Sequence, residues 1–154
     1  LRFLSVSRVM IIRFSPSSRD LVYFYQRHGL TSIHTPGHTN CSYSFLMKDR
    51  VFTGDTLLIN GTGRIDFQGG SAKDQYNSIF NNLLKLPEKT LVYPAHDYNG
   101  KKFSTIIQEK NNNPRLQVNS LNEYEEIMNN LKLARPNNMD VNIPANIKGL
   151  TLKN

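Results

Sequence analysis

Short runs of apolar and β-branched residues alternate with polar turns through the middle of the chain. Such runs, bounded by Gly, Pro or charged residues, are typical of β-strands. The turn Lys48-Asp49-Arg50 separates two of them, and Pro36-Gly37 ends another. The runs that predict strands are 30–34, 42–47, 51–53 and 90–93, and residues 21–25 form a further stretch rich in β-formers.

A helical spacing of apolar residues follows in the second half of the chain. Ser71 has Asp74 three residues further on, a pair that is typical of a helix N-terminus. Pro87 ends the periodic segment. The apolar residues between them that share one helical face are Tyr76, Ile79, Phe80, Leu83 and Leu84.

Two more helices are predicted nearer the C-terminus. Ser104 is expected to cap a helix that runs to Lys110. Ser120 and Glu123 form a capping box before a second periodic segment. Residues 60–70, which are polar and rich in glycine, predict a loop. Strands followed by helices predict an α/β fold built in layers.

The chain has the length of one domain, but its first residues differ in composition from the rest. Residues 1–20 hold four arginines and five serines, with no acid before Asp20. This composition is typical of a mitochondrial transit peptide, and an aberrant reading frame would account for it equally well. We therefore expect an atypical segment at 1–29, targeting-like or aberrant, a domain at 30–146 and a tail at 147–154.

Composition and charge argue against several classes of partner. The net charge of +7 comes from Lys and Arg residues that are scattered along the chain, which favours a solvated basic surface over nucleic-acid binding. No apolar run approaches the roughly 20 residues that a membrane span needs. Cys41 is the only cysteine, which excludes an internal disulfide and fits a reducing compartment. We expect a cytoplasmic protein, with the mitochondrial matrix as the alternative.

Three junctions between a strand and a loop each carry one potential metal ligand. They are TPGHT (35–39), FTGD (52–55) and YPAHDY (93–98), and they present His38, Asp55 and His96. Imidazole and carboxylate groups on separate rigid loops are what a metal site at one edge of a sheet requires. Taken singly, each is as easily a surface histidine or an ordinary Gly-Asp turn. Together, in this order, they predict a metal site.

These three segments resemble the later metal-site motifs of the metallo-β-lactamase superfamily. Within it, the mononuclear iron persulfide dioxygenases are resembled by GRIDFQ (63–68), YPAHDY (93–98), NPRL (113–116) and VNIPAN (141–146). The resemblance implies an α/β fold that is the C-terminal part of an αβ/βα sandwich. It also implies that glutathione persulfide is the substrate, oxidised with dioxygen to sulfite and glutathione.

The resemblance implies a metal role for each of the three junction residues. His38 and Asp55 correspond to two of the three ligands of Fe(II). His96 corresponds to a metal ligand of the related dinuclear hydrolases and lies near the iron in the dioxygenases. Two histidines and one carboxylate on one face of an iron ion leave positions open for dioxygen and a thiolate-like sulfur.

Further roles follow from the resemblance for residues around the metal. Arg64, Tyr98 and Arg115 correspond to residues that hold glutathione, whose carboxylates suit guanidinium groups. Asp97 and Tyr98 are the candidate catalytic residues, and Asp66 and Asp97 could orient ligand imidazoles. From the residues alone, the alternatives are a loop salt bridge for Arg64, a packed aromatic for Tyr98, a helix-end cation for Arg115, and turn residues for both aspartates.

The chain departs from the superfamily in one motif. His-x-His-x-Asp-His does not occur in the 154 residues, so the third iron ligand has no counterpart. We therefore expect a single chain to bind iron weakly. A partial sandwich would also leave one apolar face of a sheet uncovered, and a homodimer could cover it.

Two other functions stay open at this point. One is a glyoxalase-II-like thioester hydrolase, in which zinc would be the metal and a metal-bound hydroxide would attack the acyl carbon. The other is an inactive remnant, or a module that binds a thiol without turnover, which the missing motif favours. The residues Asp66-Phe67-Gln68 and the segment 93–98 favour the dioxygenase.

Overall fold

The computed structural model describes residues 29–67, 69–134, 139, 141 and 144–145 of the chain. The atypical segment expected at 1–29 lies outside the described residues except for Gly29, and so does the β-rich run 21–25. The tail at 147–154 lies wholly outside them, and the motif at 141–146 does so in part.

A five-stranded sheet forms the base of the described structure. Its strands are β1 (Thr31–His34), β2 (Tyr43–Leu46), β3 (Arg50–Gly54), β6 (Leu91–Pro94) and β7 (Ser104–Thr105), in the spatial order β1-β2-β3-β6-β7. Neighbours are antiparallel except for β3 and β6, which are parallel. The four runs predicted at 30–34, 42–47, 51–53 and 90–93 are thus confirmed as strands, and β7 was not predicted.

A small hairpin occupies part of the segment predicted to be a loop. Its strands are β4 (Leu57–Leu58) and β5 (Gly61–Thr62), and Asn60 at the turn has a positive φ of 56°. Asparagine tolerates this left-handed conformation better than other non-glycine residues. Only two residues lie in each strand, so no alternating pattern could signal the hairpin in the sequence.

The helices begin close to where the sequence predicts. Ser71 caps α1 (Ala72–Tyr76), and the segment continues through the π-helical η1 (Asn77–Asn82) and the 3-10 turn η2 (Leu83–Lys85) before Pro87. Ser120 caps α3 (Leu121–Asn129) by accepting the N–H of Glu123.

The cap predicted at Ser104 is wrong by one residue. Thr105 caps α2 (Ile106–Asn112), and its hydroxyl accepts the N–H of Gln108 while the Gln108 side chain accepts the N–H of Thr105. Ser104 is instead buried in β7. A short 3-10 turn, η3 (Pro114–Leu116), follows α2.

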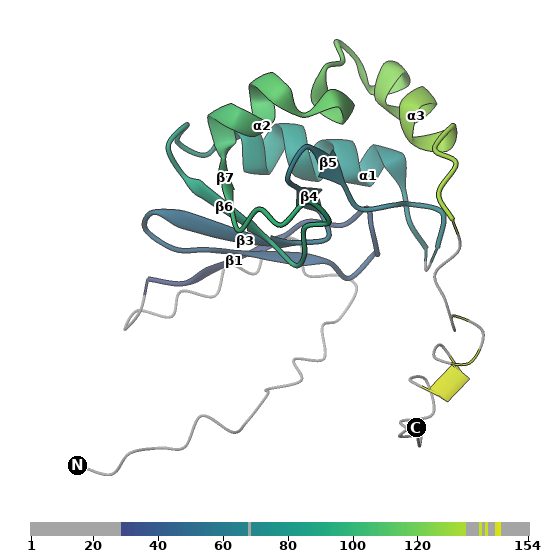
Figure 1. Ribbon diagram of the computed structural model, residues 1–154, viewed down its shortest axis with the longest axis horizontal. Helices are drawn as coiled ribbons and strands as arrows, with labels where there is room; N and C mark the ends of the chain where they lie inside the picture. The colour runs from purple at the N-terminus through teal and green to yellow at the C-terminus, as the bar shows by residue number, and fades with distance from the viewer. Residues whose placement is uncertain (1–28, 68, 135–138, 140, 142–143, 146–154) are drawn as a thin grey trace.

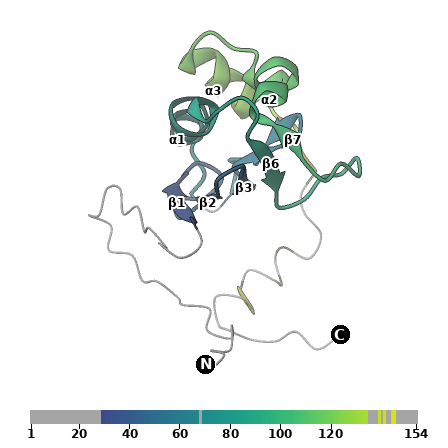
Figure 2. The same ribbon diagram turned by 90° about the vertical axis from the view of Figure 1, so that its left-hand side faces the viewer.

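The helices α1, α2 and α3 lie on one face of the sheet, as Figures 1 and 2 show. Val51 and Val92 project from neighbouring strands into the core between the layers. The helices and the hairpin fill the other side of that core with Leu57, Ile79, Leu83, Ile106 and Tyr124, all fully buried. The layered α/β fold predicted from the sequence is confirmed.

The opposite face of the sheet carries aromatic side chains that remain partly exposed. Phe45 and Phe52 face each other across β2 and β3, and Phe52, Tyr93 and Phe103 follow in contact with ring centroids 5.5 Å apart at each step. None of the helices α1, α2 and α3 lies over this face. An exposed aromatic face matches the expectation for a partial sandwich, and the expected homodimer stays a prediction. Within the described part of the chain, no helix has the length and apolar character to cross a membrane.

Candidate metal centre and pocket

Three strands deliver the predicted metal ligands to the same edge of the sheet. β1 and β3 are each antiparallel to β2, and β6 is parallel to β3, so β1, β3 and β6 all run in one direction. His38, Asp55 and His96 follow the C-terminal ends of these strands, and a backbone hydrogen bond of 3.0 Å from Ala95 to Gly54 joins two of the loops. Topology therefore brings together residues that are far apart in the sequence.

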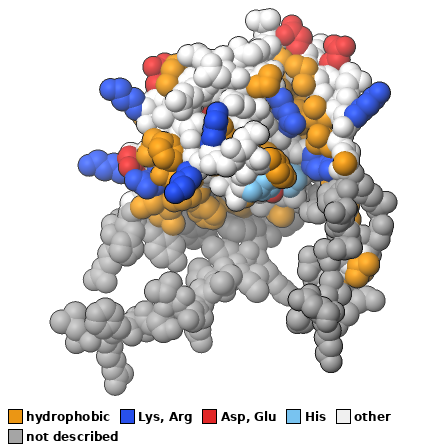
Figure 3. Space-filling view, in the orientation of Figure 1, with side chains coloured by type: hydrophobic (Ala, Val, Ile, Leu, Met, Phe, Trp, Pro, Cys, Tyr) orange, Lys and Arg blue, Asp and Glu red, His pale blue; other side chains and the backbone are white. Residues whose placement is uncertain are grey.

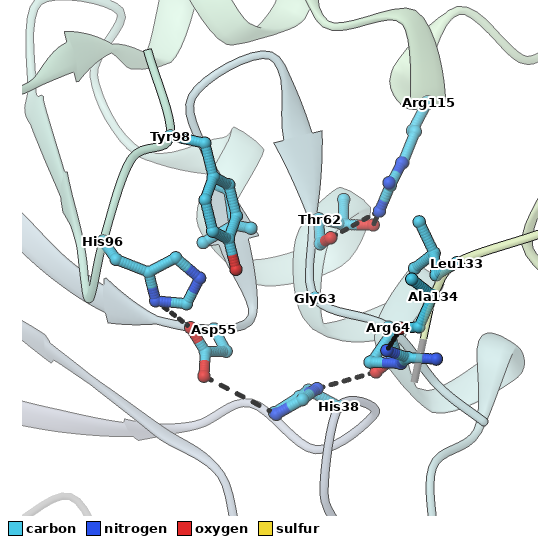
Figure 4. A pocket seen from close by; sticks show the side chains of 11 residues that line it. His38, Asp55, Thr62, Gly63, Arg64, His96, Tyr98, Arg115, Leu133 and Ala134 are labelled. Carbon is cyan, nitrogen blue, oxygen red and sulfur yellow. Dashed lines mark hydrogen bonds and ion pairs between the residues drawn. The ribbon is translucent and has the colours of Figure 1, made fainter. Parts of the chain in front are cut away.

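A pocket of about 380 Å³ opens between these loops and the hairpin. Six of the seven predicted site residues line it, and Figure 4 shows how they lie. The lining consists of His38, Asp55, Arg64, His96, Tyr98 and Arg115, together with Leu58, Thr62, Gly63, Leu133 and Ala134. In Figure 3, histidine side chains reach the surface between hydrophobic and basic side chains.

Two glycines allow the loops around His38 to approach each other. Gly37 has a φ of +139°, and a Cβ at this position would overlap the backbone of Gln75 in α1. A Cβ on Gly63 would overlap the carbonyl of Asp55 and would lie 3.0 Å from Cγ of His38. Both positions therefore require glycine for steric reasons, and both place the His38 ring.

The hydrogen bond of His38 fixes which ring nitrogen faces the pocket. Nδ1 of His38 lies 2.6 Å from the carbonyl oxygen of Arg64, and a carbonyl can only accept, so Nδ1 carries the proton. Nε2 then faces Oδ2 of Asp55 at 3.6 Å, which is too far for a hydrogen bond. In the neutral imidazole Nε2 carries a lone pair that is directed at the Asp55 carboxylate. A cation, or a second proton on the ring, would relieve that arrangement.

Asp55 has a second oxygen that no donor satisfies. Oδ1 is buried and accepts no hydrogen bond, although Nδ1 of His96 lies 3.3 Å away. Buried polar atoms normally have partners, so an orphaned carboxylate oxygen beside two imidazoles needs an explanation. Oxygen and imidazole nitrogen are the donors that bind iron or zinc, and the residues present fit such an ion.

The three ligands do not surround a single point. Asp55 lies between the two imidazoles, with Oδ2 toward His38 and Oδ1 toward His96 (Figure 4). Among the described residues, no group of three His, Cys, Asp or Glu side chains is arranged to hold one metal ion. The metal roles of His38, Asp55 and His96 therefore stay a prediction. His38 with Asp55 forms one pair of donors, and His96 stands on the other side of the carboxylate.

Arg64 lies at the pocket, but its side chain is already engaged. Its guanidinium donates two hydrogen bonds of 2.6 Å to Asp66 and one of 2.9 Å to the carbonyl of Ala134, and it stacks over Phe67 at 3.9 Å. The Asp66 carboxylate raises the pKa of Arg64, and the Arg64 guanidinium lowers the pKa of Asp66. The loop salt bridge is thus what the side chain forms here, and substrate binding by Arg64 stays a prediction.

Arg115 offers a cation without a carboxylate partner among the described residues. Its Nη1 donates to the carbonyl oxygen of Thr62 and, at 3.2 Å, to the hydroxyl of the same residue. Burial lowers the pKa of Arg115, because removing the guanidinium from water disfavours its charge. A partly buried cation on the pocket wall is suited to an anionic group of a ligand.

The loop after β6 contributes one pocket residue and one turn residue. Tyr98 is 86% exposed, and its ring packs edge-on against His96 with centroids 4.9 Å apart. Asp97 points elsewhere: its Oδ2 accepts the N–H groups of Asn99 and Lys101, each at 2.8 Å. These are the contacts of a turn residue, which was the alternative interpretation of Asp97.

The sequence does not predict that the carbonyl of Arg64 orients the His38 imidazole. Asp66 and Asp97 were expected to hold ligand imidazoles, but Asp66 binds Arg64, and the carbonyl of Arg64 binds His38. A backbone carbonyl is present at every residue, so no residue type signals this role. Thr62 and Gln75, which also hold the pocket wall, carry no motif either.

Comparison with known proteins gives the same family for both sequence and structure. The family model of the metallo-beta-lactamase superfamily matches residues 26–96. The mitochondrial persulfide dioxygenase ETHE1 of Mus musculus is 43% identical over 126 residues, which make up 80% of this chain and 49% of that protein. A hydroxyacylglutathione hydrolase of Dictyostelium discoideum is 35% identical over 97 residues, 56% of this chain and 35% of that protein.

The described fold is also similar to a solved structure. The crystal structure of ETHE1 from Myxococcus xanthus superposes with a TM-score of 0.71 at 48% sequence identity, covering 78% of this chain and 57% of that one. The chain spans about half the length of the curated relatives that it matches.

Proposed function

We propose that this chain, which belongs to the metallo-β-lactamase superfamily, supplies iron and substrate ligands of a glutathione-persulfide dioxygenase. His38 and Asp55 would hold the iron, and the pocket beside them would hold the thiol substrate. The mouse relative named persulfide dioxygenase, which matches over 80% of this chain, supports the reaction class.

The observation that carries the proposal is the arrangement of His38 and Asp55. Nδ1 of His38 is committed to a carbonyl at 2.6 Å, so the Nε2 lone pair faces the pocket and the Asp55 carboxylate. Histidine ligands of metal sites are commonly fixed in this way, with the other ring nitrogen donating to a carbonyl or carboxylate. A bound cation would satisfy both the lone pair and the carboxylate.

The reaction consumes one dioxygen and one water for each glutathione persulfide, giving glutathione, sulfite and two protons. Bound iron would supply the positions at which dioxygen and the persulfide sulfur meet. The residues of this chain would bind and orient the substrate. Arg115 would pair with a glutathione carboxylate, and the exposed phenol of Tyr98 would cover the pocket from the side of His96.

The proposal is tested with the purified chain loaded with Fe(II) in the absence of oxygen. Glutathione persulfide and oxygen are then supplied, and oxygen uptake and sulfite are measured together. We expect slow turnover with one dioxygen consumed per sulfite, above that of a His38→Ala/Asp55→Ala double variant. Equal rates for the two proteins would contradict the proposal and favour the inactive or thiol-binding alternative.

A thioester hydrolase is the second candidate, because a hydroxyacylglutathione hydrolase is among the relatives. Zinc would then be the metal, and water activated at the metal would attack the thioester. Hydrolysis of lactoylglutathione by the zinc-loaded chain, with no sulfite formed by the iron-loaded chain, would favour this function. The location in the cytoplasm or in the mitochondrial matrix stays a prediction.

A further inference from the structure

The backbone of residues 60–64, of which Thr62, Gly63 and Arg64 line the pocket, forms a wall that is held by side chains from elsewhere in the fold. At each residue one backbone group bonds a side chain from elsewhere in the fold. The N–H of Asn60 is bound by Glu109, and the carbonyls of Gly61, Thr62, Gly63 and Arg64 are bound in turn by Asn113, Arg115, Gln75 and His38. The wall is therefore fixed by side-chain contacts as well as by the hairpin.

Gln75 is the only one of these side chains that comes from α1, and it is fully buried. Its Nε2 donates to the carbonyl of Gly63 at 3.0 Å, and its Oε1 accepts the hydroxyl of Tyr124 at 2.9 Å. Both functional atoms of the amide are thus satisfied, which a buried amide requires.

Tyr124 keeps this amide in a single orientation. The phenol is fully buried in α3, and burial raises its pKa to about 12, so it remains a hydroxyl that can donate. Because the hydroxyl donates to Oε1 of Gln75, the amide nitrogen is directed to the carbonyl of Gly63. A flipped amide would place its nitrogen against the tyrosine and its oxygen against a carbonyl, losing the second hydrogen bond.

Gln75 also contacts the loop that carries His38. A Cβ on Gly37 would overlap the Cα of Gln75, so α1 packs directly against the backbone beside the histidine. The N–H of Ser71, just before α1, donates to the carbonyl of Gly37 at 2.8 Å. One buried residue therefore touches both loops whose meeting forms the bond between His38 and the carbonyl of Arg64.

We propose that Gln75, held by Tyr124, is a positioning residue of the metal centre. It fixes the peptide that precedes the Arg64 carbonyl, so that this carbonyl accepts Nδ1–H of His38 and Nε2 stays directed at Asp55. The inference rests on the proposed metal function of His38 and Asp55. In the sequence, Gln75 lies among other polar residues of α1 and carries no motif.

The proposal is tested with Gln75→Leu, with Gln75→Leu/Tyr124→Phe, and with Ser120→Ala as a control for general destabilisation. Ser120 caps α3, where its hydroxyl accepts the N–H of Glu123 and its carbonyl accepts the N–H of Tyr124. The affinity for Co(II) and Zn(II) is measured by titration, and thermal unfolding is measured on the same samples. The ring nitrogens of His38 are followed by 15N NMR in the metal-free proteins, which reports the tautomer directly.

We expect Gln75→Leu to lower metal affinity by about 10-fold to 100-fold, the range for loss of a group that orients a ligand. The double variant should regain part of the thermal stability, since it removes the Tyr124 hydroxyl that Gln75→Leu leaves unsatisfied. It should not regain metal affinity, because the carbonyl of Gly63 still lacks its donor. In both variants the NMR signals should show a mixed His38 tautomer. Ser120→Ala should lose stability and keep its metal affinity and tautomer.

The outcomes separate this proposal from the proposed function. If the wild-type chain binds no metal but Gln75→Leu alters the His38 tautomer, the metal function fails and the positioning role stands. If the wild type binds metal and Gln75→Leu changes neither affinity nor tautomer, the positioning role is wrong. A metal affinity that tracks thermal stability across all three variants would likewise overturn it.

Discussion

The two histidines that flank Asp55 sit in opposite surroundings. The side chain of His38 is 24% exposed, its Nδ1 is bound to a carbonyl, and glycines bring two loops against its ring. The side chain of His96 is 43% exposed, and its described contacts are the Asp55 carboxylate and the exposed ring of Tyr98. One side of the pocket is built to hold a ligand in place, and the other is open to solvent. From this difference we expect the firm metal contact at His38 and the entry of substrate on the side of His96.

The largest expected effect comes from removing the donors on the fixed side. His38→Ala or Asp55→Ala should lower Fe(II) or Co(II) affinity by more than about 100-fold, which exceeds the usual cost of losing an outer partner. His34→Ala is the matched control, because His34 is exposed and, among the described residues, its ring bonds the carbonyl of Asn40 and packs at a tilt against Tyr43. Titration followed by metal analysis measures the affinity of each variant. Equal affinities for His38→Ala, Asp55→Ala and His34→Ala would contradict a metal role for His38 and Asp55.

Substitution of Arg115 tests whether the pocket beside the proposed metal site binds an anion. Arg115→Met should raise the Kd for glutathione by about 10-fold or more, because a charge-assisted hydrogen bond is lost in a partly buried place. Arg115→Lys should recover only part of the affinity, since an ammonium cannot reproduce the guanidinium fork.

Arg50→Met is the control for that experiment. It makes the same change in net charge, but Arg50 pairs with Asp49 at 2.7 Å and stacks on Tyr93, outside the pocket. Calorimetric titration with glutathione should find its affinity unchanged. An equal loss in both variants would mean that overall charge, not the pocket, governs binding.

His96 should matter less than His38 for metal affinity. His96→Ala is expected to weaken binding by less than about 10-fold, below the usual range for an oriented partner, because its ring is exposed and forms no hydrogen bond to Asp55. The same titration as for His38→Ala provides the comparison. A loss as large as that of His38→Ala would show that the two sides of the pocket are equivalent.

The salt bridge of Arg64 should give the smallest effect. Asp66→Asn should cost no more than about 1 kcal/mol at pH 7, since the Asp66 side chain is half-exposed. The pKa of Asp66 is lowered in the folded chain, so its contribution is present above the unfolded value and disappears as pH falls through the folded one. Denaturant unfolding at pH 7 and near pH 3 should show the difference shrinking, and a constant difference would rule out the ion pair as its source.

The parts of this fold that the sequence reveals are those with a local pattern. Ser71 and Ser120 signal helix starts because capping needs particular side chains, and the alternation around Val51 signals a buried strand. The site follows from the positions of His38, Asp55 and His96 after strands, together with the family resemblance for Arg115.

What the sequence does not reveal depends on groups without a chemical signature. The carbonyl of Arg64 and the amide of Gln75 act only because distant loops meet, and neither residue type predicts such contacts. The hairpin at 57–62 was predicted in part as loop, since its strands are too short for a pattern. Arg64 was expected to face the substrate, but a neighbouring Asp66 competes for its guanidinium.

The most direct test of the account is the position of a bound metal ion relative to His38. A crystal structure of the chain loaded with Fe(II) or Zn(II), with the ion located by anomalous scattering, gives that position. We expect the ion at about 2.0–2.2 Å from Nε2 of His38 and from a carboxylate oxygen of Asp55, with Nδ1 still bound to the carbonyl of Arg64. An ion bound elsewhere, or one held through Nδ1 of His38, would contradict the account.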